Sequence, residues 1–432
     1  MVEVLKRQNT LDKVARDITE GRSEHDRAQV PGFAGLAVDP DNNRLHLYWK
    51  GTPPQRVQRI LEKLPGGVSA DIVPSRYSKA ELQQAGEKLL KDGKPIALQP
   101  ASGVPVHVTS MGGANDGSGL RITYDGAAAA PSLTAHPSEA VNESKSKEIK
   151  EVTERLAGVK TSVAYAPVAD SDPITDLGQS SPGPRRELVS SNPTRKHDTA
   201  PWYGGSALKN PTGGICSSGF PVKDRNGAFL LSAARHCDGA EGYWQTWEGA
   251  ENVGTSDRQQ SDLGTDTVGI ALHGAESRGF LYDGEAYRTD GFAKRVVGYG
   301  HNNVGDYVCT DGANGGVHCN IKITDTDIGV AGSNGSWRPI TDRAAVSQYS
   351  PDQVAGVNGD SGGPVFAGVN NYSDDEARGT ITAFEKTTTC PSSLNADTVL
   401  DGHVRTPWCF TAVYYVPVYQ TLQTLKWTLV TG

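Results

Sequence analysis

The sequence predicts an α+β first half followed by an all-β second half that closes with one helix. Three observations carry this fold class. In the first half, apolar residues recur at helical spacing between short strand-like runs. In the second half, short strand-like runs alternate with turns about every ten residues, and glycine is frequent, as in a sandwich or barrel. All six cysteines also lie in the second half.

The first half predicts strands and helices in alternation. LAVDPDNNRLHLYWKG predicts two strands around a turn. A helix follows in PPQRVQRILEKL, where one face carries the apolar residues Val57, Ile60, Leu61 and Leu64. VSADIVP predicts a strand, and the capping-box spacing of Ser78 and Glu81 predicts the start of a second helix.

The pattern then recurs as a strand in GLRITYDG, a helix in SKEIKEVTERL and a strand in GVKTSVAYAPV. Similarity between QRILEKLPGGVSADIV and KEVTERLAGVKTSVAY predicts a duplicated strand–helix–strand unit. We therefore expect a first domain at 1–170, with two related subdomains at about 1–126 and 140–170. The Ala/Pro/Ser-rich stretch between them predicts a linker.

Residues 171–198 contain few apolar side chains and several prolines, which predicts an exposed linker that proteases can reach. It is either a plain connector or a processing segment, and its position between two domains favours processing. We expect the second domain at 199–432. Its final stretch, VYYVPVYQTLQTLKWTLVTG, predicts the C-terminal helix around 417–425.

Composition excludes several functions. After residue 200 the chain has about 16 basic and 25 acidic groups, so it offers no basic surface for nucleic acid. No apolar run approaches the roughly 20 residues that span a bilayer, which argues against a membrane protein. The even cysteine count predicts disulfides and secretion, although MVEVLKRQNTLDKVARD lacks the apolar core of a signal peptide. Without a C-x-x-C pair, we expect no metal and no cofactor.

A candidate nucleophile lies in GVNGDSGGPVF. Glycines around Ser361 allow backbone N–H groups to converge, although Gly, Asp and Ser are also common in plain surface turns. A serine hydroxyl needs a base, and FLLSAARHCDGA supplies His236 at the end of an apolar strand. Asp266, which precedes the apolar run TVGIAL, is the expected acid, and Asp262 is its competitor.

The motifs SAARHC, DTVGIAL, VCTDGANGGVHC and GDSGGP, in this order, resemble those of chymotrypsin-like serine peptidases. The resemblance extends from about residue 199 to the end and is strongest to the bacterial secreted branch that includes streptogrisins and α-lytic protease. It implies a double six-stranded-barrel fold for the second half. In that branch a pro-region precedes the peptidase, assists its folding and inhibits it, and we expect this role for the first half. An ordinary accessory domain is the alternative.

The resemblance implies a role for each motif residue. Ser361 attacks the scissile carbonyl, His236 transfers the proton and Asp266 orients the imidazole. The N–H groups of Gly359 and Ser361 form the oxyanion hole. It also implies three disulfides, Cys216–Cys237, Cys309–Cys319 and Cys390–Cys409.

The resemblance further places a specificity pocket at Ala355, Val357, Asn358, Thr382, Ala383 and Phe384. Ala355 stands where trypsin-type enzymes have an aspartate, so we expect a small or medium apolar side chain before the cleaved bond. Phe384 replaces a usual glycine and narrows the cleft. Arg235 replaces a small residue, and Thr310 replaces an arginine that usually pairs with the aspartate before the serine. Asp360 then lacks its expected counter-charge, and Arg235 is a candidate to supply it.

These observations predict a secreted, monomeric serine endopeptidase made as a zymogen. Its partners would be protein or peptide substrates and its own pro-region. A peptidase-fold protein that binds without cleaving is the alternative, since Arg235, Thr310 and Phe384 depart from the family pattern. An acyltransferase or esterase with the same triad is a third interpretation.

Overall fold

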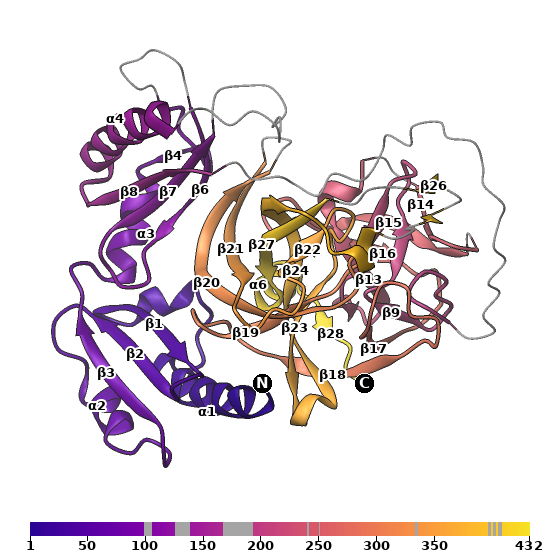
Figure 1. Ribbon diagram of the computed structural model, residues 1–432, viewed down its shortest axis with the longest axis horizontal. Coiled ribbons are helices and arrows are strands. Elements are labelled where there is room, and N and C mark those ends of the chain that lie inside the picture. The colour runs from indigo at the N-terminus through magenta and orange to yellow at the C-terminus, as the bar shows by residue number, and fades with distance from the viewer. Residues whose placement is uncertain are drawn as a thin grey trace. The chain divides into compact units, whose positions relative to one another are not determined.

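The computed structural model describes residues 1–98, 106–125, 139–166, 193–239, 242–249, 251–332, 336–395, 399–400, 403–404 and 408–432. The chain forms two compact units, shown as a ribbon in Figure 1. Unit 1 comprises Met1–Ala169 together with His301–Asp306 and Ile323–Arg343. Unit 2 comprises the remainder. Two segments of the second half therefore belong to unit 1, which the sequence analysis did not predict.

Unit 1 begins with helix α1 (Val2–Thr19), a short 3-10 turn η1 (Asp26–Gln29) and a three-stranded sheet. Strand β1 (Phe33–Asp39) is antiparallel to β2 (Arg44–Trp49), which is parallel to β3 (Ser69–Pro74). Helix α2 (Gln55–Leu61) makes the crossover between β2 and β3. The predicted strands and helix are confirmed, whereas α1 was not predicted. Its buried apolar side chains are Leu5, Leu11, Val14, Ala15 and Ile18.

The same connectivity occurs a second time in unit 1. Strand β6 (His107–Gly113) is antiparallel to β7 (Leu120–Asp125), which is parallel to β8 (Thr161–Tyr165) after helix α4 (Glu139–Ala157). The predicted strand–helix–strand unit thus occurs twice in unit 1. The predicted subdomain limits at 126 and 140 are wrong, because β7 and β8 pair across them. The expected linker lies mostly outside the described residues.

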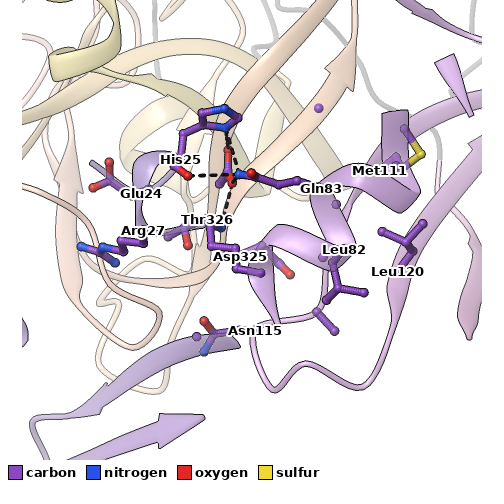
Figure 2. Close-up of a pocket in the computed structure, with 18 of the residues that line it drawn as sticks. Glu24, His25, Arg27, Leu82, Gln83, Met111, Asn115, Leu120, Asp325 and Thr326 are labelled. Atoms are coloured by element: carbon purple, nitrogen blue, oxygen red, sulfur yellow. Dashed lines mark hydrogen bonds and ion pairs between the residues drawn. The ribbon is translucent and has the colours of Figure 1, made fainter. Parts of the chain in front are cut away.

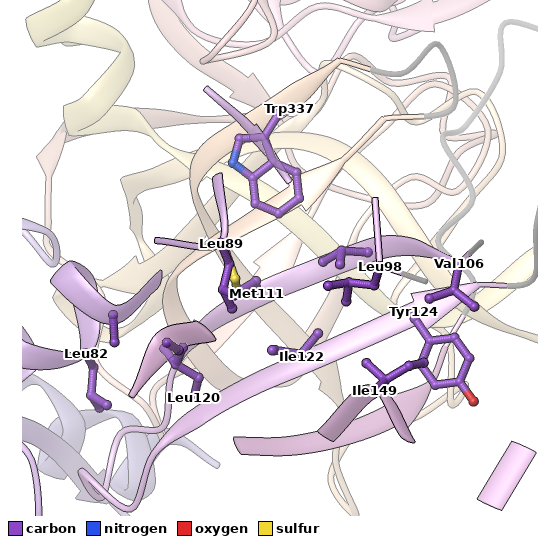
Figure 3. Packing of buried hydrophobic residues seen from close by; sticks show 13 residues of the cluster. Leu82, Leu89, Leu98, Val106, Met111, Leu120, Ile122, Tyr124, Ile149 and Trp337 are labelled. Atoms are coloured by element: carbon purple, nitrogen blue, oxygen red, sulfur yellow. The ribbon is translucent and has the colours of Figure 1, made fainter. Parts of the chain in front are cut away.

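Between the two sheets the chain forms α3 (Lys79–Glu87) and a small hairpin of β4 (Leu90–Lys91) and β5 (Lys94–Pro95). The predicted capping box is present at Ser78 and Glu81. Figure 3 shows the apolar cluster beneath this helix and the second sheet. Trp337, a residue of the second half of the chain, is part of that cluster.

A hairpin from the second half completes the second sheet of unit 1. It consists of strands β20 (His318–Ala331) and β21 (Trp337–Val346), of which residues 323–343 belong to unit 1. Ile328 of β20 pairs with Gly112 of β6 in antiparallel register. A Cβ atom on Gly112 would lie 2.3 Å from the Ile328 side chain, so only glycine allows this close approach.

Unit 2 contains two large sheets. The first has the order β11-β10-β14-β15-β16-β13-β12-β28. Its strands are β10 (Ala207–Lys209), β11 (Ile215–Ser217), β12 (Pro221–Lys223), β13 (Phe229–Ala234), β14 (Tyr243–Thr246), β15 (Asn252–Asp262), β16 (Thr267–Ala271) and β28 (Thr428–Leu429). Trp244, Leu231 and Ile270 are central in its apolar core.

The second sheet centres on the long strand β24, which pairs with β23, β18 and β27. Besides the ends of β20 and β21, its strands are β9 (Trp202–Gly204), β17 (Ser277–Tyr282), β18 (Ala293–Tyr299), β19 (Tyr307–Thr310), β22 (Gly356–Val357), β23 (Pro364–Val369), β24 (Asp374–Thr388) and β27 (Cys409–Pro417). Strands β25 (Val399–Leu400) and β26 (His403–Val404) form a separate pair.

Helices are few in unit 2. The predicted C-terminal helix is confirmed as α6 (Val418–Leu425). The others described are α5 (Ser392–Asn395) and the 3-10 turns η2 (Arg235–Cys237) and η3 (Asn370–Tyr372). Across the described ranges, every helix is too short or too polar to cross a membrane.

One prediction about the connector is wrong. Residues 171–192 of the expected exposed linker lie outside the described residues, but its final part is buried. Thr194, Arg195, Lys196 and Asp198 are all less than a tenth exposed. The buried Asp198 carboxylate accepts hydrogen bonds from the Tyr203 N–H and from the hydroxyls of Ser206 and Tyr282.

Candidate active site

His236 lies on η2, where β13 ends. The apolar residues of β13 pair with β16, which holds the end of this strand in the sheet. Disulfide Cys216–Cys237 joins the residue after His236 to β11. The His236 side chain is only 6% exposed. Sheet pairing and the covalent link thus hold the imidazole in place.

Asp266 directly precedes β16 and faces His236. Its Oδ2 atom lies 2.6 Å from His236 Nδ1, and its Oδ1 atom accepts the His236 backbone N–H at 2.9 Å. Asp266 has a positive φ of 47°, a conformation that is uncommon outside glycine. The competing acid, Asp262, instead accepts the Thr265 N–H and caps the intervening turn.

Thr382 also contacts this carboxylate, donating its hydroxyl to Asp266 Oδ2. The sequence analysis had placed Thr382 in the specificity pocket. Its position two residues before Phe384 gave no indication of this contact, because the contact joins strands distant in sequence. The hydrogen bond helps to hold the carboxylate toward His236.

Ser361 completes the set, with Oγ 2.7 Å from His236 Nε2. Its turn depends on glycines with positive φ, 93° at Gly359 and 80° at Gly362. A Cβ atom on Gly362 would lie 2.6 Å from the Ala234 backbone nitrogen, so the turn packs directly against the end of β13. Among the described residues, none accepts a hydrogen bond from the Gly359 N–H. The structure thus brings together the three predicted catalytic side chains.

Asp360 points away from this group into a loop at 312–315. Its carboxylate accepts the N–H groups of Asn314, Gly315 and Val357, each at 2.9 Å. Burial raises the pKa of Asp360, while hydrogen bonds from Gly315 and Asn314 oppose that rise. A Cβ atom on Gly312 would lie 2.3 Å from the carboxylate carbon, which explains the glycine in DGANGG.

The expectation that Arg235 compensates Asp360 is wrong. Arg235 donates to the Asp238 carbonyl at 2.9 Å and lies 3.6 Å from the Asp238 carboxylate. Its position beside His236 on η2 turns the guanidinium toward this neighbouring residue. Thr310, which replaces the usual arginine, donates its hydroxyl to the Ala355 carbonyl.

The predicted specificity residues lie on β22, its flanking loop and β24. Ala355, Val357, Ala383 and Phe384 are fully buried. The ring of Phe384 stacks on Phe410, with centroids 4.8 Å apart. A Cβ atom on Gly356 would lie 2.3 Å from the Phe384 ring, so the two residues are in tight contact. Asn358 is held by paired hydrogen bonds with the Trp408 backbone.

A second polar site lies in unit 1, in a pocket of about 200 Å³ (Figure 2). Asp327, on the hairpin, contacts His25 Nδ1 at 2.8 Å, Gln83 Nε2 at 2.9 Å and Lys79 Nζ at 2.7 Å. Burial alone would raise the pKa of Asp327, but Lys79 and His25 outweigh it and hold the pKa below its usual range. These ion pairs fix the hairpin within unit 1.

One curated relative and several solved structures are similar to this chain. No known protein-family model matches the chain. Serine protease 2 of Streptomyces fradiae is 30% identical over 165 residues, which are 38% of this chain and 87% of that protein. The chain belongs to the bacterial chymotrypsin-like serine proteases. Its second half therefore has the chymotrypsin-like all-β fold.

Solved structures of such proteases are also similar to this chymotrypsin-like protein. Thermobifida fusca protease A is 20% identical and Nocardiopsis protease is 21% identical, with TM-scores of 0.37 and 0.38. Each match covers 53% of this chain and 98% of the other.

This chymotrypsin-like protease contains three disulfides with the expected connectivity, Cys216–Cys237, Cys309–Cys319 and Cys390–Cys409. Within the described ranges, no three His, Cys, Asp or Glu side chains are grouped to hold a metal ion.

Proposed function

We propose that the protein is a secreted serine endopeptidase, made as a zymogen, that cleaves peptide bonds through an acyl-enzyme formed on Ser361. The observation that carries the proposal is the continuous contact from Asp266 through His236 to Ser361, at 2.6 and 2.7 Å. Both distances are within hydrogen-bond reach for proton transfer from a nucleophile to its base.

In the proposed mechanism, Ser361 Oγ attacks the scissile carbonyl while His236 Nε2 takes its proton. Asp266 keeps the other ring nitrogen protonated and stabilises the imidazolium. The N–H groups of Gly359 and Ser361 stabilise the oxyanion, and His236 then protonates the departing amine. Water, activated by His236 in the same way, hydrolyses the acyl-enzyme.

A small or medium apolar side chain before the cleaved bond suits the proposed pocket. Three of its predicted residues are the apolar side chains Ala355, Val357 and Ala383, all buried. The stacked rings of Phe384 and Phe410 occupy volume beside Gly356. A large aromatic or basic side chain therefore lacks room and a counter-charge there.

We assign the first half the role of a pro-region that assists folding and inhibits the peptidase. What supports this is that unit 1 includes residues 323–343 of the second half in its own core and sheet. A β-rich domain with many distant pairings folds slowly, so a partner that organises one of its hairpins speeds folding.

A fluorophosphonate labelling time course, read by mass spectrometry, tests the proposal. The intact chain is compared with chain cut by limited proteolysis upstream of residue 193, with Ser361→Ala as the control. Labelling of Ser361 that increases after the cut supports an inhibited zymogen. No labelling of either form, with the three disulfides intact, would favour the binding-protein interpretation. Parallel assays with a peptide and a simple ester distinguish a peptidase from an esterase.

A further inference from the structure

We propose that Arg195 is a positioning residue for the oxyanion hole and that the mature enzyme has to retain it. The inference rests on the proposed peptidase function, since it concerns the same Ser361 turn. It also sets a limit on where the chain can be processed.

Arg195 is almost entirely buried, at 3% exposure. One guanidinium nitrogen, Nη1, donates to the Asp311 carboxylate and to the Gly205 carbonyl at 2.6 Å. The other, Nη2, donates to the carbonyls of Tyr282 and Gly284 at 2.9 and 3.1 Å. A buried cation with this many acceptors is a built site rather than an incidental surface contact.

Asp311 begins the loop that holds Asp360. Arg195 Nη1 also lies 3.3 Å from the Gly312 carbonyl, so it contacts two consecutive residues of this loop. The next residues donate directly toward the Ser361 turn: the Asn314 and Gly315 N–H groups bind the Asp360 carboxylate. Arg195 is thus joined to the residue before Ser361 through a single short loop.

Two further contacts connect the same loop to the proposed oxyanion donors. The Ala313 N–H donates to Ser217 Oγ, which donates to the Gly359 carbonyl at 3.1 Å. The Asn314 side chain donates to the Asn358 carbonyl, the peptide that carries the Gly359 N–H, at 2.7 Å. The loop at 311–315 therefore contacts the peptide group before Gly359 directly and the one after it through Ser217.

Charge explains why an arginine is needed. Asp311 is completely buried, and an uncompensated carboxylate at such a position is very costly. A Cβ atom on Gly205 would lie 1.9 Å from Asp311 Oδ2, so the pair packs directly against backbone. Without the guanidinium, Asp311 has to take up a proton or reach water, and either change removes the contact that holds this end of the loop beneath Asp360.

The position of Arg195 in the chain sets the limit on processing. It lies near the end of the predicted processing segment, 171–198, beside Lys196, whose ammonium packs 4.0 Å from the Tyr287 ring centre. Cleavage after Arg195 or Lys196 would separate the guanidinium from the chain that begins the first barrel. We infer that the active enzyme begins at or before residue 195.

The experiment uses three variants of the full chain, Arg195→Met, Arg195→Lys and Arg295→Met, each cut upstream of residue 193. Arg295→Met is the control, because it removes an arginine whose side chain in its ion pair is largely exposed. For Arg195→Met, we expect kcat to fall about 100-fold while KM stays within threefold of the wild-type value, as for the loss of an oxyanion donor. Affinity for a peptide boronate should fall by the same factor, and affinity for a product peptide should not change. Arg195→Lys should recover part of the loss, and Arg295→Met should match the wild type.

A folded Arg195→Met enzyme with kcat within twofold of the wild type overturns the inference. Should Arg195→Met fail to fold, N-terminal sequencing of the active wild-type enzyme decides. A start at or before residue 195 supports the inference, whereas a fully active enzyme that begins at 196 or later overturns it. A wild type that never labels at Ser361 contradicts the proposed function instead.

Discussion

At the scale of single residues, the buried Thr382 hydroxyl is placed to affect the rate through Asp266. It donates to the Asp266 oxygen that also contacts His236. We predict that Thr382→Val lowers kcat roughly tenfold, the value of one hydrogen bond to a charged group. Thr382→Ser keeps the hydroxyl and is the control. Steady-state kinetics of both variants check this, and equal rates would contradict it.

Phe384 is the residue with the clearest consequence for specificity. We predict that Phe384→Gly raises kcat/KM for a substrate with phenylalanine before the cleaved bond by at least tenfold relative to one with alanine. Removing the stacked ring opens space beside Gly356, at a stability cost of about 3–5 kcal/mol. Phe366→Ala removes another buried phenylalanine ring of unit 2 and should leave the preference unchanged.

The buried carboxyl group of Asp375 leads us to predict that the free energy of unfolding depends on pH. Both of its carboxylate oxygens are buried and, within the described structure, without a hydrogen-bond partner. Burial, together with Asp283 and Asp374, raises its pKa to about 8, against the opposing effect of Lys294. The folded protein therefore keeps this proton after the unfolded chain has lost it, so stability falls as pH rises from about 4 to about 8.

The variant Asp375→Asn cannot ionise and should remove this decline. We expect it to gain on the order of 1–3 kcal/mol over the wild type at pH 9, and little at pH 4. Urea unfolding at a series of pH values measures the difference. A constant difference between the two proteins across the series would show that ionisation of Asp375 is not the cause.

At the scale of elements, two disulfides of similar span offer a matched comparison. The cysteines are 21 positions apart in Cys216–Cys237 and 19 apart in Cys390–Cys409, so loop entropy predicts a loss of about 3 kcal/mol when either pair is replaced by two alanines. Only the first is adjacent to His236. We predict that the two double-alanine variants lose similar amounts of Tm. The Cys216→Ala/Cys237→Ala variant should show the larger fall in kcat, measured at a temperature below the unfolding transitions of both variants.

The hairpin of β20 and β21 provides a prediction about inhibition. Gly112→Val should push β6 away from Ile328, because even a Cβ atom there would lie 2.3 Å from that side chain. After the cut upstream of residue 193, we expect the variant first half to inhibit the peptidase at least tenfold more weakly than the wild type. Gly66→Ala, at a position with open space, is the control. Equal inhibition by both would exclude this pairing from the inhibitory contact.

At the scale of the whole molecule, the sequence was informative where structure is local and less so where distant segments meet. The strands and helices around Ser78, His236 and Asp266 follow from capping residues and apolar runs. The hairpin at 323–343 was placed with the wrong unit, because its partners lie 200 residues away. Arg195 was assigned to an exposed linker because its segment is polar. A buried polar segment whose charged groups bind other residues of the protein has the same composition as a segment exposed to solvent.

Residues 323–343 belong to the second half of the chain but pack in unit 1, and this arrangement has a consequence for evolution. Ile328 and Trp337 serve the sheet and core of unit 1, so selection on them acts through folding and not through catalysis. In a lineage that lost its first 169 residues, these two side chains would drift toward polar ones while the Ser361 turn stayed constant. Among relatives that keep the first half, position 112 and position 328 should change together.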